Sequence, residues 1–72
     1  MSPKDLFPLT QKELSVLNDH LHVESLMAQK CRFYAEMAED QQIKTLFAKL
    51  AESHQSHYDR IFGYLRDNME LQ

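Results

Sequence analysis

Glu24, His54 and His57 are ionisable residues that stand where the hydrophobic pattern of this 72-residue chain requires apolar side chains. His54 and His57 are three residues apart, so on a helix they lie on one face. One carboxylate and two imidazoles form a ligand set that zinc and iron accept in proteins. If the fold brings Glu24 to the level of the two histidines, the three side chains form a candidate metal site.

The same residues also suit a structural role without a cofactor. Buried glutamate and histidine side chains can hydrogen-bond to each other and fix the register of two packed helices. We expect no enzyme, because no nucleophile is placed beside the histidines. Cys31 stands among alanines on the apolar stripe and is predicted to be a buried, inert thiol. Two interpretations stay open: a polar layer with no cofactor, and a site for zinc or iron.

A capping box predicts the start of the first helix. Thr10 and Glu13 have the spacing at which each side chain satisfies a free backbone N–H group of the other residue. Beyond it, the inward positions alternate in steps of three and four residues, which is typical of a helix in a coiled-coil-like seam. These positions are Leu14, Leu17, Leu21, Glu24, Ala28, Cys31, Ala35 and Ala38. A flanking stripe widens the apolar face and consists of Val16, His20, Val23, Met27, Tyr34 and Met37.

A second helix with the same spacing follows. Its predicted inward stripe is Ile43, Phe47, Leu50, His54, His57, Ile61 and Tyr64 or Leu65. Its predicted flanks are Leu46, Ala51, Tyr58 and Phe62.

A turn near Asp40 separates the two helices. A single continuous helix is the alternative, because no glycine or proline lies between Leu9 and Gly63. However, continuing the first stripe past Ala38 leads only to polar positions, whereas the apolar stripe restarts at Ile43. Asp40 is also a good N-cap residue. We therefore predict an antiparallel hairpin, with helices at about 11–39 and 41–67 and a turn at about 39–41.

The hairpin brings the three ionisable residues to one level. Glu24 lies sixteen residues before Asp40, and His54 and His57 lie fourteen and seventeen residues after it. A chain of this length buries a thin core, and small scaffolds are commonly supported by disulfides, metals or self-association. With one cysteine there is no disulfide within the chain. We therefore predict that two hairpins pair as a homodimer, which makes an all-α four-helix bundle.

The composition argues against some classes of binding partner and predicts where the protein is located. The formal net charge is −3 with acids and bases interspersed, so no nucleic-acid partner is expected. No apolar run approaches the roughly 20 residues of a membrane span, so no membrane is expected either. The single cysteine and the lack of a hydrophobic signal segment at Met1–Leu9 predict an intracellular protein. Residues 1–9 form an arm, interrupted by Pro3 and Pro8, that we expect to lie across the end of the bundle.

The stretch from Leu9 to Leu65 resembles the spore coat protein F family of endospore-forming Firmicutes. The matching segments are Leu9–Leu14, Tyr34–Ala38, Leu46–Phe47 and Leu50–Tyr58. The resemblance implies a ferritin-like helical hairpin and a bacterial, sporulation-linked structural protein. It also implies the spore coat as a location and other coat proteins as partners.

A wider resemblance is to the ferritin-like and rubrerythrin proteins, whose di-iron sites use a glutamate on one helix and Glu-x-x-His on the next. Glu24 matches the first glutamate and His57 matches the histidine. His54 departs from the pattern, because it stands in place of the bridging glutamate. A dimer would supply two glutamates beside four histidines, which favours zinc, or no metal, over iron oxidation chemistry.

Overall fold

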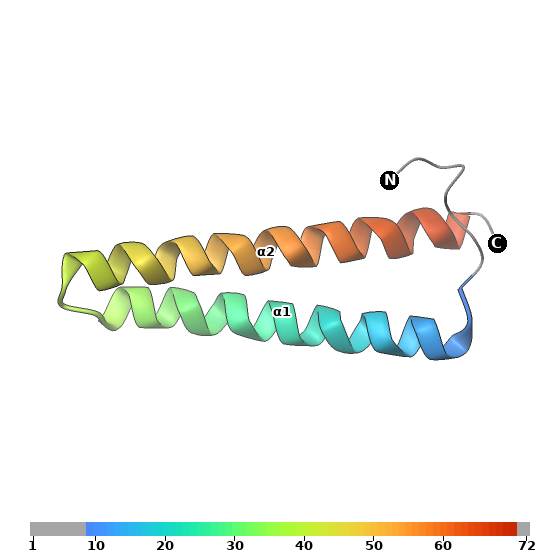
Figure 1. Cartoon of the computed structure of the whole chain (residues 1–72), viewed down its shortest axis with the longest axis horizontal. Coiled ribbons are helices and arrows are strands. Elements are labelled where there is room, and N and C mark those ends of the chain that lie inside the picture. The colour runs from blue at the N-terminus through green and yellow to red at the C-terminus, as the bar shows by residue number, and fades with distance from the viewer. Residues whose placement is uncertain (1–8, 71–72) are drawn as a thin grey trace.

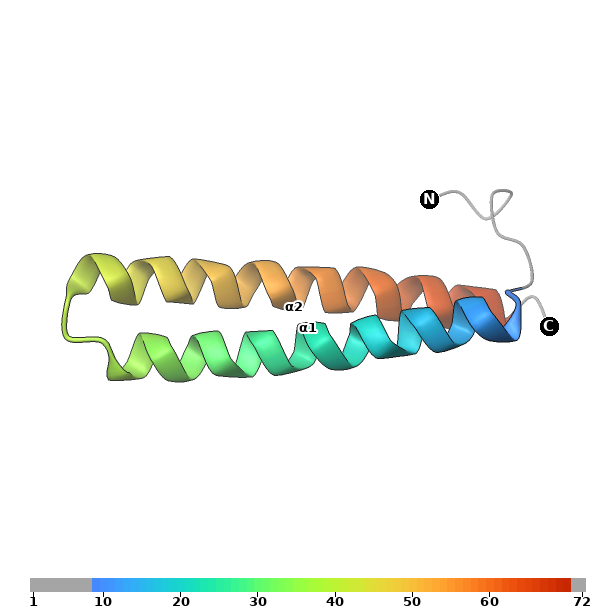
Figure 2. The ribbon, with the colours of Figure 1, turned by 60° about the horizontal axis from the view of Figure 1, so that its bottom comes forward.

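The computed structural model describes residues 9–70, which form two antiparallel α-helices joined by a short loop (Figure 1). Helix α1 spans Gln11–Met37 and helix α2 spans Gln41–Glu70. The two helices lie side by side along their length, as a second view also shows (Figure 2). The prediction of an all-α helical hairpin is confirmed. The predicted arm lies outside the described residues except for Leu9.

The capping box at the start of α1 is formed as predicted. The backbone N–H of Glu13 donates to Thr10 Oγ1 at 3.1 Å, and the backbone N–H of Thr10 donates to Glu13 Oε1 at 2.9 Å. These bonds satisfy N–H groups that have no partner within the helix. The backbone hydrogen bond from Thr10 is also the main reason that the pKa of the Glu13 carboxyl lies below its ordinary value.

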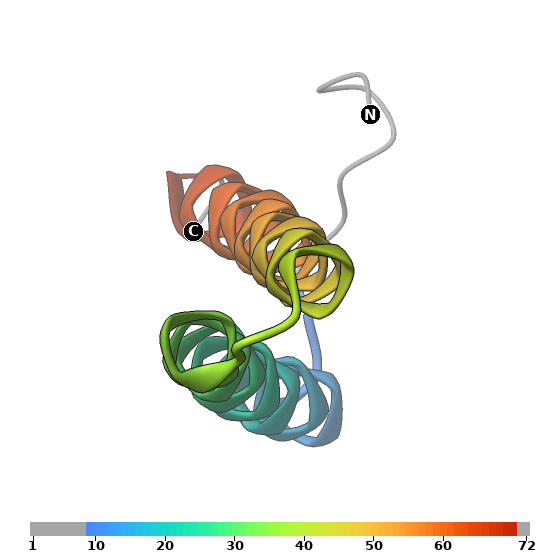
Figure 3. The same cartoon turned by 90° about the vertical axis from the view of Figure 1, so that its left-hand side faces the viewer.

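The loop between the helices is closed by two side chains. Asp40 Oδ1 accepts hydrogen bonds from the backbone N–H groups of Gln42 at 2.8 Å and Ile43 at 3.1 Å, so Asp40 is the N-cap of α2. The ammonium group of Lys44 donates to the carbonyl oxygens of Ala35 at 2.9 Å and Glu36 at 3.2 Å. These bonds satisfy two N–H groups of α2 and two carbonyl groups of α1 at the ends that meet at the loop. Figure 3 views the hairpin from this loop end. Helix α1 ends two residues before the predicted limit, and α2 continues three residues beyond it.

The inward stripe of α1 is confirmed. All eight predicted positions from Leu14 to Ala38 are buried or half-buried, and Ala28 and Cys31 are the most enclosed. Cys31 is a buried free thiol, as predicted.

The inward stripe of α2 differs from the prediction. Ile43 and Leu50 are exposed, as is His57, whereas Ala51 and Tyr58, predicted as flanks, face α1. A physical reason is that Ala51 is small, as are the buried α1 residues Ala28 and Cys31, and small side chains on both helices let the seam close. The inward positions of α2 are Lys44, Phe47, Ala51, His54, Tyr58, Ile61, Leu65 and Asn68.

The hairpin has two open faces on either side of its seam. The first, here called the His57 face, consists of the residues one position before Leu21, Ala28 and Ala35 on α1 and one position before Lys44, Ala51, Tyr58 and Leu65 on α2. Its members are His20, Met27 and Tyr34 on α1 and Ile43, Leu50, His57 and Tyr64 on α2. The second, here called the groove face, consists of residues that each follow an inward residue. The hydrogen bond from Arg32 to Gln55, both of that second kind, shows that such positions of α1 and α2 share one face.

The core of a single copy is thin. Among the described residues, the buried hydrophobic side chains are those of Ala28, Cys31 and Ala51. The exposed large hydrophobic residues are Val16, Val23, Leu26, Phe33, Tyr34, Met37, Ile43, Leu46, Leu50, Phe62 and Met69. One seam is closed and the flanks stay open. Neither helix contains, in its described part, an apolar stretch long enough to cross a bilayer.

Candidate metal centre

The three residues that the sequence singled out come together on the seam. Glu24 lies near the middle of α1, and His54 and His57 lie on successive turns of α2. Glu24 Oε2 is 2.7 Å from Nδ1 of His54 and 3.5 Å from Nδ1 of His57. The two imidazole rings are perpendicular, with centroids 6.1 Å apart. One carboxylate oxygen is therefore shared between two imidazole nitrogens that converge on it.

Burial is uneven across the cluster. The side chains of Glu24 and His54 are 17% and 25% exposed, whereas that of His57 is 52% exposed. His54 lies on the seam, and His57 lies on the His57 face. The cluster is thus closed toward α1 and open on one side of the hairpin.

Hydrogen bonding sets the charge state of Glu24. The hydrogen bond from His54 lowers the pKa of the Glu24 carboxyl below its ordinary value, and positive charge on either histidine lowers it further, against the opposing effect of burial. An ionised carboxylate only accepts hydrogen bonds, so Nδ1 of His54 carries the proton in this contact. To bind an ion through Nδ1 instead, His54 must place its proton on Nε2.

The dimensions of the cluster suit a small metal ion. Each residue offers one ligand atom, and these atoms lie within 4.8 Å of one another. Zinc binds nitrogen and oxygen ligands at about 2.0–2.2 Å, so tetrahedral ligand atoms are roughly 3.3 Å apart. The 3.5 Å between Glu24 and His57 already matches this spacing. A small side-chain rotation would widen the 2.7 Å contact between Glu24 and His54 to the same spacing.

The other histidines do not join this cluster. His20 and His22 are exposed on α1, and i, i+2 positions diverge on a helix. Within residues 9–70, the Glu24 cluster is the one group of three or more histidine, cysteine or acidic residues whose ligand atoms converge.

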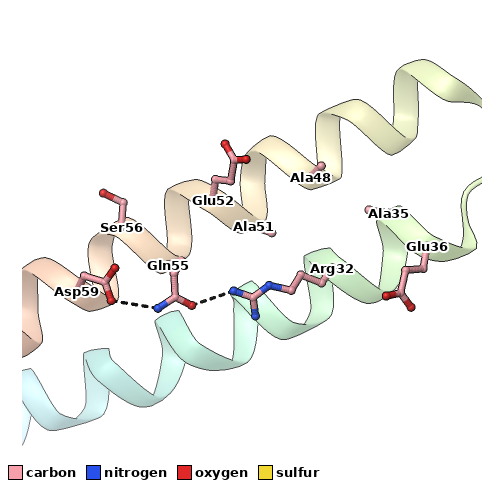
Figure 4. Close-up of a pocket in the computed structure, with 9 residues that line it drawn as sticks. All are labelled: Arg32, Ala35, Glu36, Ala48, Ala51, Glu52, Gln55, Ser56 and Asp59. Atoms are coloured by element: carbon pink, nitrogen blue, oxygen red, sulfur yellow. Dashed lines mark hydrogen bonds between the residues drawn. The ribbon is translucent and has the colours of Figure 1, made fainter.

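A second polar network lies on the groove face and was not foreseen from the sequence. Arg32 donates to Gln55 Oε1 at 2.9 Å, and Gln55 Nε2 donates to Asp59 Oδ1 at 3.1 Å (Figure 4). The network borders a shallow groove whose floor includes Ala35 and Ala51. The i, i+4 spacing of Gln55 and Asp59 could have indicated the hydrogen bond between these two residues. The hydrogen bond from Arg32 could not be predicted, because it depends on how the two helices are aligned.

Asn68 is a further polar residue that the sequence did not single out. It is buried near the end of α2, and neither Nδ2 nor Oδ1 has a hydrogen-bond partner in the part of the chain that the structure describes. Its position continues the inward stripe of α2, which could have identified it.

No protein-family model, curated protein or solved structure matches this chain. The resemblance to spore coat protein F therefore stays a prediction, and functional inference rests on the side chains themselves.

Proposed function

We propose that this protein binds a divalent transition metal ion, of which zinc fits best, through Glu24, His54 and His57. The observation that carries this proposal is the convergence of Nδ1 of both histidines on one oxygen of Glu24. Burial alone does not require that arrangement, because a single histidine would satisfy a half-buried carboxylate. Two imidazoles and a carboxylate match three-ligand zinc sites that keep one position open.

The ligand chemistry favours zinc over a pair of iron ions. Di-iron sites in helical bundles use bridging carboxylates to balance the charge of the metals. Here Glu24 is the single carboxylate of the cluster, beside two neutral nitrogen donors. Zinc accepts such a nitrogen-rich set without a redox partner.

The proposal includes a homodimer in which a second hairpin covers the His57 face. Ile43 and Leu50 are exposed on that face, which also includes the half-exposed ring of His57. Covering them would stabilise the dimer by about 25 cal/mol for each Å² of apolar surface removed from water. It would also enclose the open side of the cluster. Helices of 27 and 30 residues, roughly 40 Å long, are of ordinary length for a four-helix bundle.

A calorimetric zinc titration tests the metal site. The untagged wild-type protein should take up zinc, and His54→Ala should not. His22→Ala is the matched control, because it removes an exposed histidine outside the cluster, and it should bind as the wild type does. Failure of the wild type to bind, or equal binding by His54→Ala, would refute the proposal.

A structural role is the second candidate, and one observation favours it. The 2.7 Å hydrogen bond between His54 and Glu24 satisfies the half-buried carboxylate without any ion. In that case the chain is a non-enzymatic bundle of the type that the resemblance to spore coat protein F implies, located in the coat beside other coat proteins. The double variant Glu24→Leu/His54→Leu would then be as stable as the wild type or more so.

A further inference from the structure

The side of α1 that points away from α2 is unusually apolar. Five large hydrophobic residues stand on it, each between 47% and 63% exposed: Val16, Val23, Leu26, Phe33 and Met37. In a helix that packs on one side only, the opposite side is normally charged or polar. An apolar helix surface on both sides indicates that α1 has a second neighbour.

Helix α2 provides an internal comparison. Its positions that point away from α1 are mostly polar and exposed. They include Lys49, Ser53, Ser56 and Arg60. Both helices belong to the same hairpin and have nearly the same length, so the apolar outer surface is a property of α1 and not of the chain as a whole.

The spacing of the α1 residues is that of a coiled-coil seam. Starting at Lys12, steps of four and three alternate without interruption to Met37 and also include Asp19 and Lys30. We call these eight positions the outer stripe of α1. A heptad seam over nearly four repeats is what a facing helix requires.

We propose that the outer stripe of α1 binds the outer stripe of α1 in a second copy of this chain, with the two helices antiparallel. The charged residues of the stripe are the reason for proposing a second copy as the partner and an antiparallel direction. When Val23 faces Leu26 of the second copy, Val16 faces Phe33 of that copy. In the same register Asp19 faces Lys30, and the two-fold symmetry repeats each pair.

A parallel arrangement is disfavoured by the same residues. If two parallel copies of α1 align residue for residue, Asp19 faces Asp19 and Lys30 faces Lys30. These like charges repel each other at the seam and disfavour parallel pairing. The antiparallel arrangement instead pairs opposite charges on both sides of the Val23–Leu26 contact. The stripe is therefore complementary to itself in one direction only.

This surface is separate from the His57 face and goes beyond the proposed metal-binding function. The outer stripe lies opposite the seam, whereas the His57 face lies beside it. A copy with two self-complementary surfaces assembles beyond a dimer, because each surface recruits a different neighbour. Zinc binding uses no residue of the stripe, so either proposal can fail without the other.

Charge reversal combined with analytical ultracentrifugation tests the pairing. Asp19→Lys and Lys30→Asp should each reduce the sedimenting mass at least twofold relative to the wild type. The double variant Asp19→Lys/Lys30→Asp should restore the mass, because it re-creates the pair between copies. Arg60→Asp reverses a charge on the outer side of α2 and should leave the mass unchanged.

Cross-linking checks the direction independently. Asp19→Cys mixed with Lys30→Cys, both in a Cys31→Ala background, should form a mixed disulfide within the assembly and little of either symmetric one. A monomeric wild type, an unchanged mass in both single variants, or symmetric disulfides alone would overturn the proposal. Circular dichroism on each variant confirms that the hairpin remains helical.

Discussion

Glu24 Oε2 lies 2.7 Å from His54 Nδ1 and joins α1 to α2 near the middle of the hairpin. Around this contact the most buried side chains of the seam are small, such as those of Ala28 and Ala51, and they allow close approach but specify alignment weakly. This half-buried polar contact, together with the exposed hydrogen bond from Arg32 to Gln55, fixes which residues of α2 face which residues of α1. The contact also determines where His57 stands.

The first prediction concerns the stability of the metal-free protein. His54→Ala leaves the carboxylate of Glu24 half-buried without its main partner, so we expect a loss of roughly 1–2 kcal/mol in the free energy of unfolding. Urea denaturation in the presence of a chelator measures it. His22→Ala, at an exposed site, should change stability by less than about 0.5 kcal/mol. Equal losses in both variants would show that the contact contributes nothing specific.

The second prediction concerns the stability of the fold at acidic pH. The pKa of Glu24 is lower in the folded chain than in the unfolded chain, where a glutamate titrates near 4.3. Its contribution to stability is therefore present above about pH 4.3 and disappears as the pH falls through the lower folded value. Thermal unfolding of chelated protein between pH 7 and pH 3 measures this, with Glu24→Gln as the comparison. The wild type should lose more stability than Glu24→Gln below pH 4.3, and parallel profiles would contradict the assignment.

The third prediction concerns the start of α1. Thr10→Ala removes the acceptor for the Glu13 N–H group, and we expect it to cost about 0.5–2 kcal/mol of unfolding free energy. Thr10→Ser keeps a hydroxyl at the same place and should retain most of the stability. Urea denaturation of the wild type and both variants measures these changes in unfolding free energy. If both lose the same amount, the effect comes from the methyl group of the threonine and not from the cap.

Local signals in the sequence were enough to predict the hairpin. The Thr10–Glu13 spacing and the Asp40 cap act within one turn of chain, so they do not depend on how the helices pack. The inward stripe of α1 was also predictable, because its small and apolar residues leave one face for the seam. Those signals together placed Glu24 at the level of the histidines.

The rotation of α2 could not be predicted in the same way. Two neighbouring rows of residues on α2, one through Leu50 and one through Ala51, both fit a helical period. Which row packs against α1 depends on the size of the α1 residues that it meets. The sequence therefore placed His57 on the seam, whereas it is half exposed beside it. The partnership of Arg32 with Gln55 has the same origin, since it joins positions 23 residues apart.

The most direct test of the metal centre is X-ray absorption spectroscopy at the zinc edge, on untagged protein loaded with one equivalent of zinc. We expect nitrogen and oxygen ligands at about 2.0–2.2 Å, with the multiple-scattering signal of two imidazoles in the wild type and of fewer in His57→Ala. A sulfur shell near 2.3 Å would place the ion on Cys31 instead. A spectrum unchanged in His57→Ala, or the absence of imidazole scattering, would contradict the assignment of Glu24, His54 and His57 as the ligands.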